Sequence, residues 1–176
     1  MRNDIERVLI DEDVIGKRLD AMARDIERDF PGGTLVVIIL LKGALVFAAD
    51  LLRRVPRVLE IECLNVASYH GGTESTGNVD FLDRHFPEVM GRHVLLLDDI
   101  LDTGRTLHAV SQRLMAEGAL AVHTAVLLAK DKQRAEEVRA DYIGFTIGDE
   151  FVVGYGLDYQ GKYRNLPYVG VLKQLD

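Results

Sequence analysis

Apolar residues follow two different patterns along this chain. Ile15, Leu19, Met22 and Ile26 are spaced by four, three and four residues, which places them on one face of a helix. Residues 35–41 instead form an uninterrupted apolar run, which is typical of a strand covered on both faces. Together the patterns predict helices at 15–26, 44–54 and 107–118, a polar helical candidate at 131–139, and strands at 35–41, 58–69, 94–97, 122–128 and 142–145.

Strands and helices alternate in this prediction. That order indicates an α/β fold with a mainly parallel sheet flanked by helices. In such folds ligands bind where the parallel strands end. Lys42, the segment 98–106 and Lys130 all lie at or just after the ends of predicted strands, so we expect them to share a binding site. The segment 70–78 is rich in glycine and hydroxyl residues and is predicted to be a mobile loop.

Length, charge and cysteine content limit the class of protein. The 176 residues fit a single domain, 1–176, and a net charge of −7 opposes sequence-independent binding of nucleic acid, which needs a basic face. The N-terminus carries charges where a signal peptide would have its apolar core, and the longest aliphatic run is too short to span a bilayer. The only cysteine, Cys63, cannot form an intrachain disulfide and is predicted to be a small buried residue. We therefore expect a cytoplasmic protein that binds neither nucleic acid nor a membrane.

The segment 98–106 combines two kinds of chemistry. Its second half, Thr103-Gly104-Arg105-Thr106, offers backbone N–H groups and hydroxyls to an anion at a helix N-terminus. The upstream carboxylates would repel a phosphate, so Asp98 and Asp99 are better explained as acceptors for sugar hydroxyls or as partners of a hydrated Mg²⁺. A ligand that has both vicinal hydroxyls and a phosphate satisfies the two halves, which predicts a ribose-phosphate site.

Asp102 lies one residue before the anion-binding turn and would be close to the anomeric carbon of such a sugar. A carboxylate there can accept a proton and oppose positive charge on the sugar, so Asp102 is the candidate general base. The alternative is an ordinary strand-to-helix turn in which an Asp or Thr caps the helix. The segment has neither the Lys-Ser/Thr ending of a Walker loop nor a Gly-x-Gly-x-x-Gly pattern, which disfavours nucleotide hydrolysis and dinucleotide binding.

With these residues placed, the chain resembles the purine phosphoribosyltransferases of the hypoxanthine-guanine type, the salvage enzymes that join a purine base to phosphoribosyl pyrophosphate. The loop 98–106 is common to all phosphoribosyltransferases of this fold, whereas the segment 151–158 resembles the purine-salvage branch in particular. Further matching segments are 41–43, 68–69, 127–130 and 163–168. The resemblance implies the type I phosphoribosyltransferase fold, with a small hood subdomain from the N- and C-terminal segments, and a homodimer or homotetramer.

On the sugar side, the resemblance implies contacts with ribose and with both phosphate groups. Asp98 and Asp99 would hold the ribose hydroxyls, although the family usually has Glu in place of Asp98. The residues implied to wrap the 5′-phosphate are Thr103, Gly104, Arg105 and Thr106. The residues implied to bind pyrophosphate, often beside a non-proline cis peptide, are Lys42, Gly43 and Arg164. Ser68 and Tyr69 would begin the loop that closes over the reacting sugar.

On the base side, the resemblance implies that Asp102 acts at purine N7 while N9 attacks the sugar. Lys130 would donate to the purine O6 and so favour 6-oxopurines over adenine. Phe151 would stack on the base, and Val152 and Asp158 would lie at the purine edge. The residues implied to bind Mg²⁺, the expected cofactor, are Asp158, Asp98 and Asp99.

Several alternatives remain open at this point. Lys130 could be a surface lysine paired with Asp131, Phe151 could be a core residue, and Asp158 with Arg164 could be a surface ion pair. At the level of function, the chain could be a regulatory protein of the same fold that senses phosphoribosyl pyrophosphate or a nucleotide, although its acidity and the presence of Asp102 disfavour this. A pyrimidine or adenine phosphoribosyltransferase is disfavoured by Lys130 together with the segment 151–158.

Overall fold

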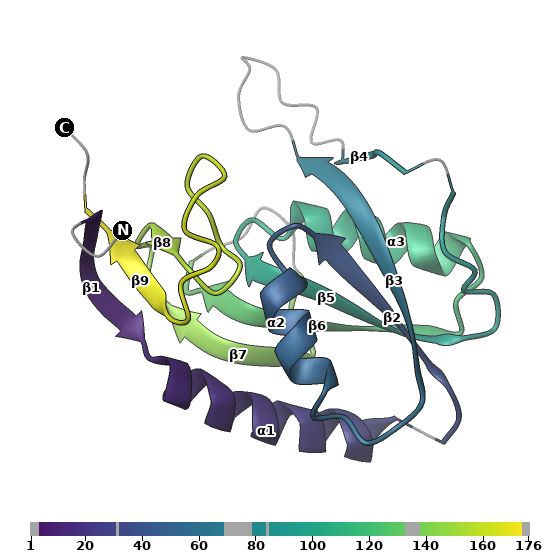
Figure 1. The fold of residues 1–176 in the computed structure, drawn as a ribbon. Coiled ribbons are helices and arrows are strands. Elements are labelled where there is room, and N and C mark those ends of the chain that lie inside the picture. The colour runs from purple at the N-terminus through teal and green to yellow at the C-terminus, as the bar shows by residue number, and fades with distance from the viewer. Residues whose placement is uncertain (1–3, 31, 69–78, 84, 133–137, 174–176) are drawn as a thin grey trace.

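A computed structural model describes residues 4–30, 32–68, 79–83, 85–132 and 138–173, and its main feature is a six-stranded sheet (Figure 1). All neighbouring strands in this sheet run parallel except β4, which is antiparallel to β3. In spatial order the strands are β4 (Val79–Phe81), β3 (Leu59–Ser68), β2 (Leu35–Leu41), β5 (His93–Leu101), β6 (Ala121–Lys130) and β7 (Tyr142–Ile147). The predicted mainly parallel sheet is confirmed.

Helices cover both faces of the sheet. α1 (Glu12–Asp29) and α2 (Leu45–Leu52) pack on one face, and α3 (Arg105–Ala116) packs on the other. Alternate residues of β2 divide between the two cores, with Val37 on the side of α1 and α2 and Ile38 on the side of α3. This explains why the run 35–41 has no polar residue. None of the helices in the described ranges is long and apolar enough to cross a lipid bilayer.

A second, smaller sheet joins the two ends of the chain. It consists of β1 (Ile5–Ile10), β9 (Val169–Leu172) and β8 (Val152–Val153), paired antiparallel in that order. In Figure 1 the arrowheads of β5 and β7 point toward this sheet. It is the expected hood, built from N- and C-terminal segments. The apolar pattern alone had not indicated its short strands.

Two sequence-based predictions are not confirmed. Cys63 is exposed, so the prediction that it is buried was wrong; the helices pack mainly against β2, β4, β5, β6 and β7 and leave this part of β3 uncovered. Residues 133–137 of the helix predicted at 131–139 lie outside the described residues, and the described residues on either side of them are not helical.

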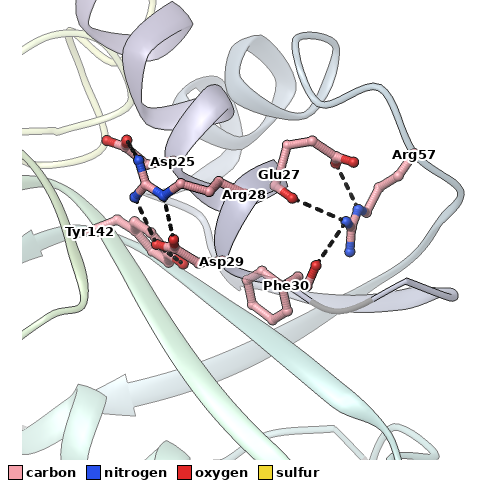
Figure 2. A network of polar contacts seen from close by, with 7 residues as sticks. All are labelled: Asp25, Glu27, Arg28, Asp29, Phe30, Arg57 and Tyr142. Atoms are coloured by element: carbon pink, nitrogen blue, oxygen red, sulfur yellow. Dashed lines mark hydrogen bonds and ion pairs between the residues drawn. The ribbon is translucent and has the colours of Figure 1, made fainter.

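A polar network holds the end of α1 to the edge of the sheet where the parallel strands begin (Figure 2). Arg57, just before β3, donates to the Glu27 carboxylate at 2.8 Å and to the Phe30 carbonyl at 3.3 Å. The Tyr142 hydroxyl, at the start of β7, donates to Asp29 at 3.3 Å. Burial, followed by the nearby Asp29 charge, raises the pKa of Tyr142 to about 12. This network leaves the opposite edge of the sheet, where the parallel strands end, available for a binding site.

Candidate active site

The site forms where the order of the strands reverses. From β2 the chain proceeds to β3 on one side, whereas β5 lies on the other side of β2. The loops that leave β2 and β5 therefore diverge, and such a switch point is where open α/β sheets bind ligands. Lys42 and Gly43 follow β2, while Asp98 and Asp99 lie near the end of β5. The sequence therefore places polar groups from two neighbouring strands at one crevice.

Lys42 and Gly43 form what we call the β2 loop, and this loop lies directly beside Asp99, one of the two β5 acids, Asp98 and Asp99. A Cβ atom added to Gly43 would lie 1.7 Å from Asp99 Oδ2, so only glycine lets the loop approach this carboxylate so closely. The peptide bond between Leu41 and Lys42 is cis, as the resemblance led us to expect near this pair. The structure thus brings together the implied pyrophosphate-binding loop and the implied ribose-binding acids.

Asp98 and Asp99 lie within β5 rather than after it, because the strand runs to Leu101. Both side chains are half-buried, and Asp98 Oδ1 accepts a hydrogen bond from the Asp99 N–H at 2.9 Å. Burial raises the pKa of both carboxyls, and the charge of Asp99 raises that of Asp98 further. Two neighbouring carboxylates that are costly to ionise favour a cation or hydroxyl donors beside them.

The turn after β5 leaves a helix N-terminus open. Gly104 occupies the N-cap position of α3 with a φ of +83°, and it has no side chain with which to cap the helix. The alternative in which an Asp or Thr caps α3 is therefore not what the structure shows. Arg105 is exposed, and its N–H donates to Thr103 Oγ1 only at 3.4 Å. N–H groups in the first turn of α3 can consequently serve an anion.

Two lysines and two aspartates meet beside this turn. Lys130, the last residue of β6, has its Nζ 3.1 Å from Asp149 Oδ1. Lys132 Nζ is 3.5 Å from the same Asp149 oxygen and also forms an ion pair with Asp102 Oδ1. We refer to Asp102, Lys130, Lys132 and Asp149 as the lysine–aspartate cluster. Sequence reasoning missed Lys132 and Asp149; their only signal was their nearness in sequence to Lys130 and Phe151.

The segment after β7 presents an aromatic ring to solvent. Phe151 is 54% exposed, which excludes the alternative that it is a core residue. Its ring meets that of Tyr159 edge to face, with centroids 5.7 Å apart and an interplanar angle of 87°. Val152, in contrast, is buried and pairs with Val171 in the hood. An exposed ring on a fixed strand end can stack on a planar ligand.

Asp158 and Arg164 form an ion pair at 2.7 Å, and Arg164 also donates to the Gly156 carbonyl at 2.7 Å. A Cβ added to Gly156 would lie 2.1 Å from the Gly43 carbonyl oxygen, so this segment touches the β2 loop. Burial raises the pKa of the Asp99 carboxyl overall, and the contact brings Arg164 near enough for its charge to oppose part of this rise. The structure therefore shows the ion pair between Asp158 and Arg164 that was the alternative interpretation of these residues. The pair lies next to the β2 loop.

Tyr155 fastens the same segment to α2. Its hydroxyl donates to Asp50 of α2, and its backbone N–H donates to the Leu166 carbonyl at 2.9 Å. Burial, followed by the hydrogen bond to Asp50, raises the pKa of the Tyr155 hydroxyl. Because α2 starts two residues after Gly43, this contact ties the position of the segment that contains Asp158 to that of the β2 loop.

Ser68 is the last residue of β3, at the same edge of the sheet as Lys42, and Tyr69 lies outside the described residues. Within the described ranges, no three His, Cys, Asp or Glu side chains lie close enough together to hold a metal ion by themselves. Any Mg²⁺ bound here would therefore need further ligands from the substrate or from water, which is its usual coordination in phosphate-binding sites.

Comparison with known proteins shows which family this chain resembles. The model of the phosphoribosyl transferase domain family matches residues 10–160. A hypoxanthine-guanine phosphoribosyltransferase of Streptococcus pneumoniae is 41% identical over 174 residues, which cover 99% of this chain and 97% of that protein. A bifunctional TilS/HprT protein of Listeria monocytogenes is 43% identical over 98% of this chain, and the chain spans only 27% of its length.

Solved structures agree in fold. A hypoxanthine phosphoribosyltransferase of Staphylococcus aureus superposes with a TM-score of 0.93 at 40% identity, covering 98% of this chain and 94% of that one. A hypoxanthine-guanine phosphoribosyltransferase of Bacillus anthracis, solved with a HEPES molecule in its active site, gives a TM-score of 0.90 at 39% identity, covering 96% and 99%.

Proposed function

The chain belongs to the hypoxanthine-guanine phosphoribosyltransferase family, and on this premise we propose that it transfers the 5-phosphoribosyl group from phosphoribosyl pyrophosphate to hypoxanthine or guanine. The products are IMP or GMP and pyrophosphate. One observation carries the proposal: the β2 loop, the β5 acids and the open N-terminus of α3 meet at the switch point of the sheet. Pyrophosphate, ribose hydroxyls and a 5′-phosphate require these three kinds of group.

The reaction follows from the order of the acids and the helix N-terminus along residues 98–106. The N–H groups at the start of α3 bind the 5′-phosphate, and Asp98 and Asp99 accept hydrogen bonds from the ribose hydroxyls. Purine N9 forms a bond to C1′ as the bond from C1′ to pyrophosphate breaks, and the bonding electrons leave with pyrophosphate. Asp102 takes the proton from N7 and opposes the positive charge that develops on the sugar. Lys42, Gly43 and Arg164 hold the departing pyrophosphate.

The base is held from two sides. Phe151 stacks on the purine plane, and backbone groups of Val152 meet its edge. Lys130 donates to O6, a position that accepts hydrogen bonds in hypoxanthine and guanine but bears a donor amino group in adenine. Since Lys130 pairs with Asp149 in this structure, binding of the base exchanges that carboxylate for O6.

Mg²⁺ fits the acidic part of this site. Asp98 and Asp99 offer oxygen ligands whose ionisation is opposed by burial, and a cation beside them would remove that cost. Asp158, at the pyrophosphate side, is the third candidate ligand. When bound, Mg²⁺ would neutralise charge on the substrate's phosphate oxygens and so assist the departure of pyrophosphate.

The most direct test is to measure pyrophosphate release with phosphoribosyl pyrophosphate and each of hypoxanthine, guanine, xanthine and adenine, with and without Mg²⁺. We expect release with hypoxanthine or guanine, little with adenine, and a requirement for the metal. Release with adenine alone would place the chain in another branch of the family. Binding of phosphoribosyl pyrophosphate without any turnover would instead favour a regulatory protein of this fold.

Lys130→Met tests the assignment of base specificity. Removing the ammonium deletes the donor to O6, so kcat/KM for hypoxanthine and guanine should fall by about ten- to a hundred-fold, while the weak use of adenine should change little. Initial rates with each base measure the ratio. Lys17→Met, which removes an exposed ammonium from α1, is the matched control. An equal loss with adenine would show that Lys130 merely supports the fold.

A further inference from the structure

Lys132 has no role in the proposed mechanism, yet it contacts the candidate general base. It lies two residues past Lys130, beyond the end of β6, and its ammonium forms an ion pair with Asp102 Oδ1. The same ammonium is 3.5 Å from Asp149, and Lys130 approaches Asp149 at 3.1 Å. Lys132 therefore contacts Asp102, which is proposed to act at N7, and shares Asp149 with Lys130, which is proposed to bind O6.

The two carboxylate oxygens of Asp102 can serve different partners, because Lys132 contacts Oδ1. Oδ1, the atom that Lys132 contacts, is fully shielded from solvent, whereas the Asp102 side chain as a whole is 39% exposed. The exposed surface of this side chain is therefore shared among Cβ, Cγ and Oδ2. Because a carboxylate can accept hydrogen bonds at both oxygens, a lysine held on Oδ1 leaves Oδ2 for the purine.

Asp149 completes the arrangement. It is 75% exposed and faces both ammonium groups, so its charge helps to keep two cations close together. If purine O6 replaces Asp149 as the partner of Lys130, Asp149 can remain beside Lys132. Lys132 can then keep its ion pair with Asp102. The purine N7 and O6 atoms are neighbours on one edge of the base, as Asp102 and Lys130 are neighbours in the cluster.

We propose that Lys132 is a positioning residue that fixes the Asp102 carboxylate so that Oδ2 faces the proton on purine N7. This inference rests on the proposed transferase function, since it assigns Lys132 to the same reaction. Lys132 acts through Asp102 and does not touch the reacting atoms. Loss of the ammonium should therefore affect the chemical step and leave the binding of phosphoribosyl pyrophosphate unchanged.

A double-mutant cycle tests the proposal. Lys132→Met should lower kcat for hypoxanthine by about ten- to a hundred-fold, with KM for phosphoribosyl pyrophosphate within about two-fold of wild type. Lys132→Arg, which keeps a cation, should restore much of the loss. In an Asp102→Asn background, Lys132→Met should cause no further decrease, because the residue through which it acts is already inactive. Lys17→Met on α1 controls for the change in net charge.

The outcomes distinguish failure of the positioning role from failure of the proposed function. Wild-type kcat in Lys132→Met, or a decrease of equal size in the wild-type and Asp102→Asn backgrounds, would overturn the positioning role. A loss that appears in KM for phosphoribosyl pyrophosphate and not in kcat would also overturn it. Absence of pyrophosphate release in the wild-type protein would instead defeat the proposed function. Thermal unfolding of every variant checks that a loss of rate does not come from a loss of folded protein.

Discussion

Asp102→Asn should lower kcat by about two to four decades and leave the affinity for phosphoribosyl pyrophosphate nearly unchanged. The amide has the size of the carboxylate but cannot accept the proton from N7 and carries no charge to oppose the developing cation. In the proposed mechanism other groups, on α3 and β5, bind the 5′-phosphate and the ribose hydroxyls, so we expect no loss of substrate affinity. The effect should therefore fall on the chemical step alone.

Steady-state kinetics give kcat for this variant, and isothermal titration gives the affinity for phosphoribosyl pyrophosphate with Mg²⁺ present. Asp13→Asn, an exposed aspartate in the first turn of α1, is the matched control for the loss of one carboxylate. If Asp102→Asn turns over at the wild-type rate, Asp102 has no part in the chemistry. If the variant loses affinity for the sugar in proportion to its loss of rate, Asp102 binds substrate and is not the base.

The apolar pattern predicted the sheet because each of its central strands is buried on both sides. The run 35–41 leaves no polar position, and alternate members pack against opposite helix layers. Burial of this kind depends on local sequence, so it can be predicted locally. The ends of β2, β5 and β6 were then enough to place Lys42, the acidic segment and Lys130 at one edge.

Features that depend on contacts between distant segments could not be predicted in this way. The hood pairs β1 with β9, strands from opposite ends of the chain, and neither strand has a distinctive pattern by itself. Cys63 occupies an apolar alternation, but whether a helix covers that stretch is decided by packing. The pairing of Lys132 with Asp102 likewise depends on how the ends of β5 and β6 align, and the spacing of residues in the sequence does not predict this alignment.

The contact between Gly43 and Asp99 leads to the second large effect. Gly43→Ala would place a methyl group 1.7 Å from Asp99 Oδ2 and 2.5 Å from its Cγ, far inside the contact distance. Asp99 has a short side chain in a half-buried strand, so the carboxylate or the β2 loop must move. Either movement separates the proposed pyrophosphate and ribose contacts. We expect kcat/KM for phosphoribosyl pyrophosphate to fall by about two decades.

Two comparisons isolate the cause of this loss. Gly32→Ala, in the loop before β2, adds the same methyl group where no atom lies within 4 Å, so it should retain wild-type activity. In an Asp99→Ala background, where the clashing carboxylate is gone, Gly43→Ala should cost little more than Asp99→Ala alone. Full activity in Gly43→Ala would mean that Asp99 can leave its position without harm, and the acid would then have no role in holding the ribose. A loss that adds in full to that of Asp99→Ala would place the effect in the loop itself, because the methyl group would then act without touching the carboxylate.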